Sequence, residues 1–205
     1  MQKTAFFCIA TLLFLSITSC RLRERFVEPP VVEVGPEVVL IPMRKDGKMG
    51  YRDKQGRIII SPRFESADTF REGFARVSEG KKYGFIDRRG QNITGFKYDY
   101  VEYFSDGLAL VGYEKDTGKK NDHGQAIIEK KRGFIDTTGK EVIPITLDGA
   151  SEFHFGIAAA TKDGKNGYIG RNGETLLPFE YEHTARFTGG FGLVKNGGKV
   201  WFVNR

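Results

Sequence analysis

The chain has 205 residues, a formal net charge of +6 and two cysteines, Cys8 and Cys20. Its 32 Lys and Arg residues are interspersed with 26 Asp and Glu residues, so the basic balance indicates a solvated surface rather than a phosphate-binding stripe. We therefore expect no nucleic-acid partner.

The N-terminal segment predicts a signal peptide over residues 1–19. Lys3 precedes an apolar run at 5–17, which at about 13 residues is short for a membrane-spanning helix of roughly 20. The run ends in Ile17-Thr18-Ser19-Cys20, which resembles the lipobox of bacterial lipoproteins. The resemblance implies that Cys20 is lipidated and anchors the chain to a membrane. The alternative is an ordinary signal cleaved nearby, with Cys20 left as a free thiol.

Removal of residues 1–19 takes Cys8 away, and lipidation consumes Cys20, so the mature domain would contain no free thiol. This excludes disulfides, thiolate metal sites and cysteine nucleophiles. Residues 20–36 contain Pro29, Pro30 and Pro36 and predict an extended tether. No acidic cluster follows Cys20. By resemblance to surface-exported lipoproteins, which carry one, we expect a cell-envelope protein that faces the periplasm rather than the cell surface.

Residues 37–205 form a repeat domain. Paired glycines recur at Gly50 and Gly56, Gly84 and Gly90, Gly133 and Gly139, and Gly167 and Gly173, at intervals of 34, 49 and 34 residues. A Phe-x-x-Gly mark keeps the same phase, at Phe70, Phe104, Phe153 and Phe187. The longer interval is one period plus an insertion of 15 residues near 112–127. Periods of this size indicate an array of supersecondary units.

Each unit reads as three strands joined by two polar turns, with no helical periodicity, so the predicted class is all-β. The pattern predicts about four and a half antiparallel three-stranded units of 34 residues in an open stack or solenoid. A closed, propeller-like ring in which residues 38–43 and 199–204 share a sheet is the alternative. Small residues hold one face of each opening strand, at Ala75, Ala109, Ala158 and Gly192, so something must pack closely over that face. In the open stack, Trp201 should cover the end of the core.

The second turn of each unit has the form Asp-x-x-Gly. Asp at its first position accepts hydrogen bonds from the turn backbone, and Gly at its fourth tolerates positive φ. The fourth unit has Gly170 in place of the Asp but keeps Gly173, which favours a backbone role. We therefore interpret these residues as structural and not catalytic: Asp53, Gly56, Asp87, Gly90, Asp136, Gly139 and Gly173.

The run Lys82-Tyr83-Gly84-Phe85-Ile86-Asp87, the Phe-x-x-Gly-Leu-Ala at 104–109 and the Gly-Lys-Glu-Val-Ile-Pro at 139–144 resemble the WG (KWG) repeat family over roughly residues 36–205. The Trp of the family name is replaced by Tyr83 in the best unit and by Met49, Arg132, Asn166 and Val200 in the others. The resemblance implies β-rich repeats with binding or scaffolding roles and no common catalytic residues.

The insertion is the one place where the chain departs from its own period. Insertions in repeat arrays map to loops on one face and often to the binding face. We predict a lengthened hairpin with its tip at 116–124, whose candidate binding residues are Tyr113, Lys119, Lys120 and His123. A tolerated polar loop is the alternative. The three histidines are scattered, so we predict no metal site, and no motif indicates a cofactor or a catalytic group.

These observations favour a non-enzymatic envelope lipoprotein whose repeats bind or scaffold a protein partner. Peptidoglycan or another glycan is the alternative ligand, and an envelope hydrolase is a further alternative for which the sequence nominates no residue.

Overall fold

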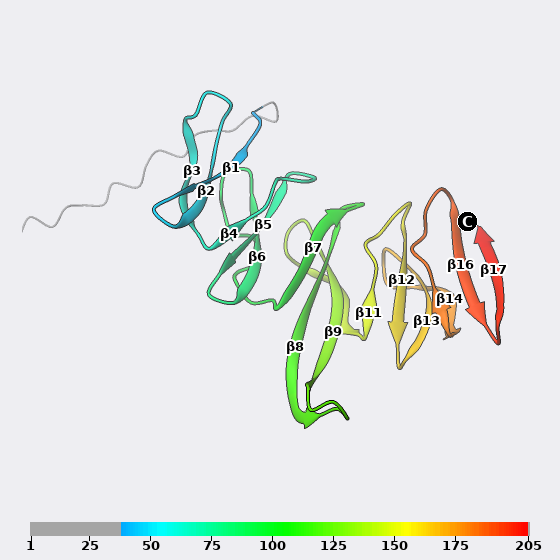
Figure 1. Cartoon of the computed structure of the whole chain (residues 1–205). Coiled ribbons are helices and arrows are strands. Elements are labelled where there is room, and N and C mark those ends of the chain that lie inside the picture. Colours follow the sequence, from blue (N-terminus) through cyan, green and yellow to red (C-terminus); the bar gives the residue numbers. More distant parts are fainter. Residues whose placement is uncertain (1–37, 205) are drawn as a thin grey trace, which may run out of the picture. The chain divides into compact units, whose positions relative to one another are not determined.

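The computed structural model describes residues 38–204, which contain strands, turns and loops and no helix (Figure 1). The predicted signal peptide at 1–19, Cys20 and the tether at 20–36 lie outside the described residues. Between residues 38 and 204, therefore, no helix has the length and apolar character to cross a membrane.

The described strands form five antiparallel sheets that follow one another in chain order (Figure 1). Sheet A contains β1 (Ile41–Lys45), β2 (Lys48–Arg52) and β3 (Ile58–Phe64). Sheet B contains β4 (Ser66–Ala67), β5 (Phe74–Glu79) and β6 (Lys82–Asp87). Sheet C contains β7 (Tyr100–Ser105), β8 (Leu108–Lys120), β9 (Ala126–Asp136) and β10 (Glu141–Leu147). Sheet D contains β11 (Gly149–Ala150), β12 (Ile157–Lys162), β13 (Lys165–Gly170) and β14 (Thr175–Tyr181), and sheet E contains β15 (His183–Thr184), β16 (Phe191–Asn196) and β17 (Lys199–Asn204).

The predicted repeat of antiparallel strands is confirmed, and each junction has one strand that the sequence did not indicate. After a sheet's third long strand, the chain crosses to the next sheet and pairs there with its first long strand, as β4 does with β5, β11 with β12 and β15 with β16. β7 fills the same place beside β8. Two-residue strands carry no alternation of polar and apolar side chains, so periodicity cannot detect them.

The second unit departs from the three-stranded pattern. The chain after β6 makes only isolated bridges to it, Ile86 with Asn92 and Tyr83 with Tyr98. A turn occupies the place of the third strand, because the Asn92 side chain accepts hydrogen bonds from the amides of Thr94 and Gly95. Side-chain bonds of this kind compete with a sheet ladder.

The hydrophobic core is divided among the four junctions between sheets. One buried cluster joins sheets A and B, another joins B and C, a third joins C and D, and the last joins D and E. The small residues of the opening strands face the preceding sheet: Ala75 lies in the first of these clusters, Ala109 in the second and Ala158 in the third. At Gly192 an added Cβ would lie 2.5 Å from the hydroxyl oxygen of Tyr168. The predicted close packing over the small face is therefore confirmed.

An equivalent aromatic pair crosses every junction. The aromatic residue that directly follows the first glycine of each glycine pair packs edge-on against the Phe of the next Phe-x-x-Gly mark, with ring centroids 4.7 to 5.9 Å apart. Edge-to-face pairs of this geometry stabilise by about 0.5–1.5 kcal/mol beyond their burial. The pairs are Tyr51 with Phe70, Phe85 with Phe104, Phe134 with Phe153, and Tyr168 with Phe187. The two sequence marks of the repeat thus contact each other between neighbouring units.

The Asp-x-x-Gly turns have the predicted geometry. In each, the Asp Oδ1 accepts hydrogen bonds from the amides two and four residues later, at 2.8 to 3.0 Å. The φ angles of Gly56, Gly90, Gly139 and Gly173 lie between 81° and 85°. Where Gly170 replaces the Asp, the Glu174 carboxylate accepts a hydrogen bond from the Asn172 amide instead. An added Cβ on Gly170 would lie 2.0 Å from that carboxylate. The Glu174 side chain therefore occupies the space that the Asp side chain fills in the other turns.

The described ends of the array belong to different sheets. β1 pairs with β2 at one edge of sheet A, and β17 pairs with β16 at one edge of sheet E. None of the five sheets closes, so the open arrangement is the one observed and the ring is not. The prediction for Trp201 is wrong, because its side chain is 44% exposed and does not cover the core. Trp201 is equivalent to Gly50, Gly133 and Gly167, and each of these glycines lies against a carbonyl oxygen of the third strand of its unit. Sheet E has no strand on that edge of β17.

Candidate functional site

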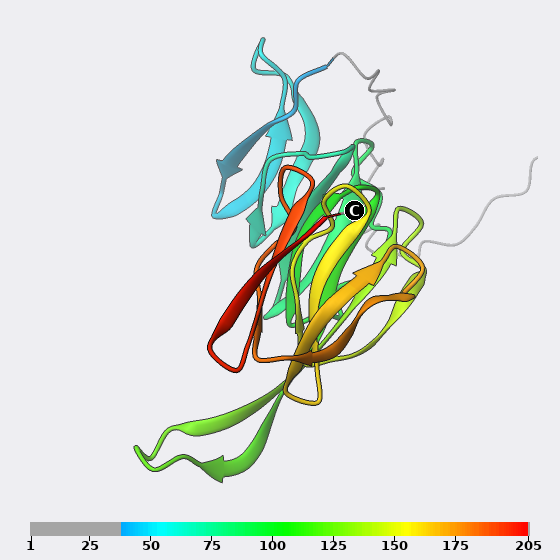
Figure 2. The ribbon, with the colours of Figure 1, turned by 90° about the vertical axis from the view of Figure 1, so that its right-hand side faces the viewer.

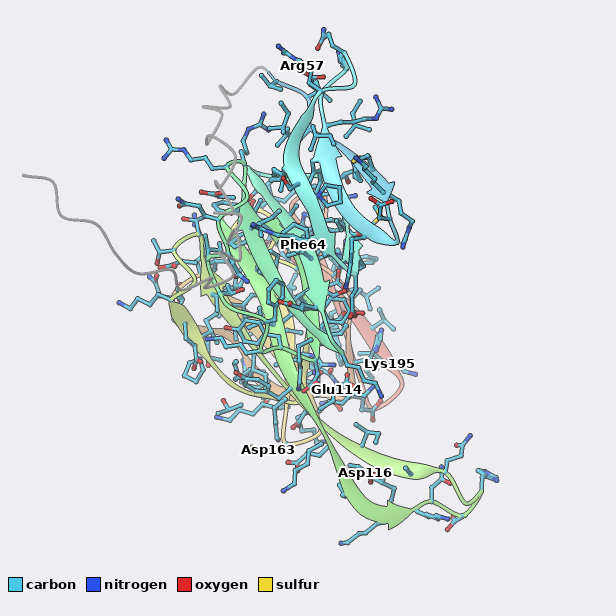
Figure 3. The ribbon with its side chains drawn as sticks, turned by 90° about the vertical axis from the view of Figure 1, so that its left-hand side faces the viewer. Arg57, Phe64, Glu114, Asp116, Asp163 and Lys195 are labelled. Atoms are coloured by element: carbon cyan, nitrogen blue, oxygen red, sulfur yellow. The ribbon has the colours of Figure 1, made fainter. Side chains whose placement is uncertain are left out.

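The β8–β9 hairpin extends well beyond the rest of sheet C (Figures 2 and 3). Every residue from Tyr113 through Lys130 is exposed. Glu114 lies where the hairpin leaves the sheet and Asp116 lies further out (Figure 3). β7 ends its pairing with β8 at Gly112, and β10 ends its pairing with β9 at Arg132. Beyond those residues both strands of the ribbon have a free edge.

The tip of the hairpin is shorter than the sequence suggested. The ladder continues to the pair Lys120 and Ala126, so residues 116–120 belong to the strand and only 121–125 turn. The Asn121 side chain accepts hydrogen bonds from the amides of His123 and Gln125, and the Gly124 amide donates to the Asn121 carbonyl. This is the hydrogen-bond pattern of the Asp-x-x-Gly turns. The insertion therefore carries its own copy of the repeat's turn, with Asn in place of Asp.

The predicted binding residues all lie on this hairpin but do not converge. Tyr113 is at its base, where its ring lies 5.6 Å from that of Tyr98. Lys119 and Lys120 end β8, and His123 lies in the tip turn. Tyr113 and Lys120 are seven positions apart in β8, which is roughly 23 Å along an extended chain. The hairpin presents a ribbon-like surface with Ile127 and Ile128 also exposed, by 41% and 40%.

A second candidate site is a groove at the junction of sheets B and C. It is a hollow of about 350 Å³. One wall comes from the second repeat unit and the other from the strand that crosses to sheet C. Its lining residues are Ser66, Asp68, Arg76, Tyr83, Asp99, Tyr100, Val101 and Glu102. We call it the B/C groove.

A polar network built on Arg76 holds one side of the B/C groove. The guanidinium pairs with Asp68 at 2.8 Å and with Glu102 at 3.2 Å, and it lies 3.8 Å from the ring centroid of Tyr103. Burial opposes the positive charge, but Asp68 and the other acidic groups outweigh it and raise the pKa of Arg76. Arg71 stacks over the same Tyr103 ring, at 3.9 Å. The side chain of Arg76 is therefore fixed and stays charged.

Tyr100 and Asp99 hold the opposite side. Burial and the hydrogen bond from the Tyr100 hydroxyl to Glu102 raise the pKa of Tyr100 to about 12. Burial would raise the pKa of Asp99, but the hydrogen bonds from Lys82 and from the Glu114 amide outweigh it and lower that pKa. Asp99 thus stays ionised and ties the two units together.

The carboxylate at the end of a unit has a structural role at three junctions, and Asp148 repeats what Asp99 does. Its carboxylate accepts hydrogen bonds from Lys131 Nζ at 2.8 Å and from the Gly164 amide at 3.1 Å. Glu182 accepts from the Gly197 amide at the next junction. These acids are committed to the hairpins of the following sheets. Within residues 38–204, no three or more His, Cys, Asp or Glu side chains gather as metal ligands would.

The sequence did not nominate the residues of the B/C groove, although one signal was present. Tyr83 occupies the repeat position at which the family name places Trp, which we call the signature position, and that position faces a junction. The equivalent residue at the next junction, Arg132, is buried, lies 4.1 Å from the ring centroid of Tyr100 and pairs with Glu114 at 2.7 Å. At this repeat position Tyr83 lines a hollow, whereas Arg132 is buried.

Successive antiparallel sheets with a core at every junction define a β-repeat protein. The model of the WG containing repeat matches four times, over residues 49–83, 83–114, 133–165 and 167–199. The chain belongs to this family, whose matches span more than half of its length. No curated protein and no solved structure matches the chain.

Proposed function

We propose that the protein is a non-enzymatic, lipid-anchored envelope protein whose WG repeats serve as a scaffold, and that the β8–β9 hairpin is its contact with a protein partner. The observation that carries this proposal is the ribbon of residues 113–130, which is exposed throughout. A two-stranded ribbon is marginally stable in water without a third strand or a core beside it. Contact with a partner would supply both.

The hairpin suits an extended polypeptide segment of the partner. Free strand edges pair readily with another strand through main-chain hydrogen bonds, and side chains on the ribbon then select the sequence. Ile127 and Ile128 offer apolar contacts. Lys115, Lys119, Lys120 and Lys130 are interspersed with Asp116, Asp122 and Glu129, and Glu114 is paired with Arg132. The fitting partner segment is therefore apolar, with side chains of both charges.

A role without catalysis is supported by the use that the fold makes of its acidic residues. Asp53, Asp87 and Asp136 close turns, and Asp99 and Asp148 join units. The repetition of these contacts shows that they serve the architecture. The envelope location rests on the segment before residue 21, which resembles a lipoprotein signal.

Cross-linking combined with a shortened hairpin tests the proposal. In the shortened variant, residues 114–130 are replaced by Asp-Gly, the turn that joins β12 to β13 at Asp163 and Gly164. We expect the full chain to capture a protein from detergent-solubilised envelopes, with cross-links from Lys119 or Lys120 to that protein. We expect the shortened variant to lose the capture, and a Lys119→Glu, Lys120→Glu variant to weaken it.

Two outcomes would overturn the proposal. One is capture that persists in the shortened variant, with cross-links that come from other parts of the chain. The other is the absence of any protein partner while purified cell wall sediments the chain, which would establish the glycan alternative in its place.

A further inference from the structure

The B/C groove is lined by Tyr83, the residue at the signature position of its unit. Of the residues equivalent to Tyr83, Arg132 fills its junction and Met49 packs against the core between sheets A and B. Tyr83 is 40% exposed and lines the hollow. The groove therefore combines an exposed aromatic wall with the polar groups of two neighbouring units.

Each carboxylate that lines the B/C groove is already paired with a cationic side chain. Asp68 and Glu102 pair with Arg76, and Asp99 pairs with Lys82. A cationic ligand would meet the Arg76 guanidinium, and an anionic ligand would meet three carboxylates. The three carboxylates do not form a cation site either, since no metal-ligand group occurs among the described residues. The ligand that fits is uncharged.

The groove is nevertheless rich in directional hydrogen-bonding groups. Carboxylate oxygens have several lone pairs each, so one ion pair leaves acceptors free, and the Ser66 hydroxyl, which is bonded to Ser78 at 2.6 Å, adds another oxygen. A ligand that both donates and accepts in several directions would use these groups. A ligand with an apolar face would also pack on Tyr83.

We infer that the B/C groove binds a neutral sugar unit of a saccharide. A pyranose ring places its C–H groups on one face, which stacks on Tyr83, and directs its hydroxyls around the rim. The hydroxyls donate to Asp68, Asp99 or Glu102 and accept from Arg76. The network of ion pairs and stacked rings around Arg76 holds these groups in place before binding, which lowers the entropic cost of complex formation. The site does not involve the β8–β9 ribbon, so it stands apart from the proposed protein contact.

Titration calorimetry with the full-length protein tests this inference. The neutral probes are an N-acetylglucosamine tetramer and maltotetraose, and the charged probes are a lysine tetrapeptide and an oligogalacturonate. We expect at least one neutral probe to bind. Tyr83→Ala should weaken that binding about tenfold through the loss of stacking, and Glu102→Gln should weaken it through the loss of a charged acceptor. Tyr83→Trp should retain or strengthen it.

Two controls keep the result specific. Phe202→Ala removes an aromatic ring that is 75% exposed outside the groove, and Lys119→Glu, Lys120→Glu alters the hairpin. Both should leave saccharide binding unchanged, and thermal unfolding should show that each variant is folded. The inference is overturned if neither neutral probe binds, if Tyr83→Ala and Glu102→Gln bind as the unaltered protein does, or if only a charged probe binds.

Discussion

The glycine after the signature position is required by the backbone of another strand. An added Cβ would lie 2.5 Å from a carbonyl oxygen at Gly50, 2.3 Å at Gly84, 2.5 Å at Gly133 and 2.5 Å at Gly167. The carbonyls belong to Ile60, Gly95, Ile143 and Leu177. No side-chain adjustment relieves a contact with a main-chain oxygen. The most regular mark of the repeat, this glycine, is therefore required by the chain segment that packs against it.

Gly133→Ala should destabilise the protein, by about 1–3 kcal/mol as overpacking of a buried site does. Its added Cβ would meet the Ile143 carbonyl oxygen at 2.5 Å. Gly149→Ala is the matched control, because the nearest atom to its Cβ, in Thr161, is 3.7 Å away and its φ is not positive. Chemical denaturation of both variants checks the prediction. Equal free energies of unfolding would show that the carbonyl does not restrict Gly133.

Gly90→Val should also destabilise, by about 1–3 kcal/mol, because it forces a β-branched residue to positive φ. The φ of Gly90 is 81°, and an added Cβ would lie 3.0 Å from a methyl carbon of Ile60 in the preceding unit. Gly47→Val separates the two causes, since Gly47 has a φ of 78° and no atom within 4 Å of its Cβ. We expect a lower melting temperature for Gly90→Val than for Gly47→Val. A melting temperature unchanged from that of the original chain would contradict the turn assignment.

The residues whose roles could be predicted from the sequence are those that contact only residues near them in the chain. Asp53, Asp87 and Asp136 bond to amides two and four residues away, so their spacing alone indicates the turn. The contact of Phe85 with Phe104 joins residues of two units. The sequence contains both marks at constant separation but does not say that they meet, because that depends on how one sheet packs on the next.

At the scale of elements, acidic side chains link the hairpins of sheets C, D and E to the unit before each of them. Asp148 joins Lys131 on β9 to the β12–β13 turn through the Gly164 amide. The hydrogen bond from Lys131, together with that from Gly164, outweighs burial and lowers the pKa of Asp148. The same pairing raises the pKa of Lys131.

A carboxyl group whose pKa is lowered on folding stabilises the folded state above its unfolded-state pKa, near 3.8. That contribution is lost as the pH falls through the lower, folded-state value. Asp148→Asn should therefore lower the melting temperature at neutral pH and lower it less in acid. Melting curves recorded between neutral pH and about pH 2 check this. Asp122→Asn, in the exposed tip, should run parallel to the unaltered protein; an Asp148→Asn curve that also runs parallel would contradict the linkage.

The hairpin shows where element prediction succeeds and fails. Its position follows from the repeat interval of 49 residues in place of 34, which can be read from the sequence. Its length was underestimated because residues 116–120 are polar and lack apolar alternation, yet they continue the ladder. A ribbon exposed on both faces has no buried side to impose such alternation.

At the scale of the whole molecule, the periodicity predicted the open array and could not predict its grooves. The opening strands alternate small and large residues, which indicates two buried faces and thus a neighbour on each side. The B/C groove is lined by Tyr83, at a repeat position where Arg132 is buried, and by Tyr100 of the next unit. That combination becomes visible only once the order and packing of the sheets are known.

The predicted anchor is tested on the whole chain. Cys20→Ser should release the protein from the membrane fraction or block its processing, because the lipidated residue is removed. Cell fractionation and the mass of the mature chain check this, with Gln2→Ser as a control substitution in the same segment. Unchanged membrane association together with an unchanged mass would exclude lipidation at Cys20.

The division of the core among four junctions has a consequence for how the chain acquires its structure. Each cluster joins two sheets that are consecutive in the chain, so the contacts close short loops, which favours rapid folding. A junction can form first anywhere in the array and be extended one sheet at a time in either direction. Damage to a single junction should then divide the molecule into segments that unfold separately, instead of destroying the whole structure at once.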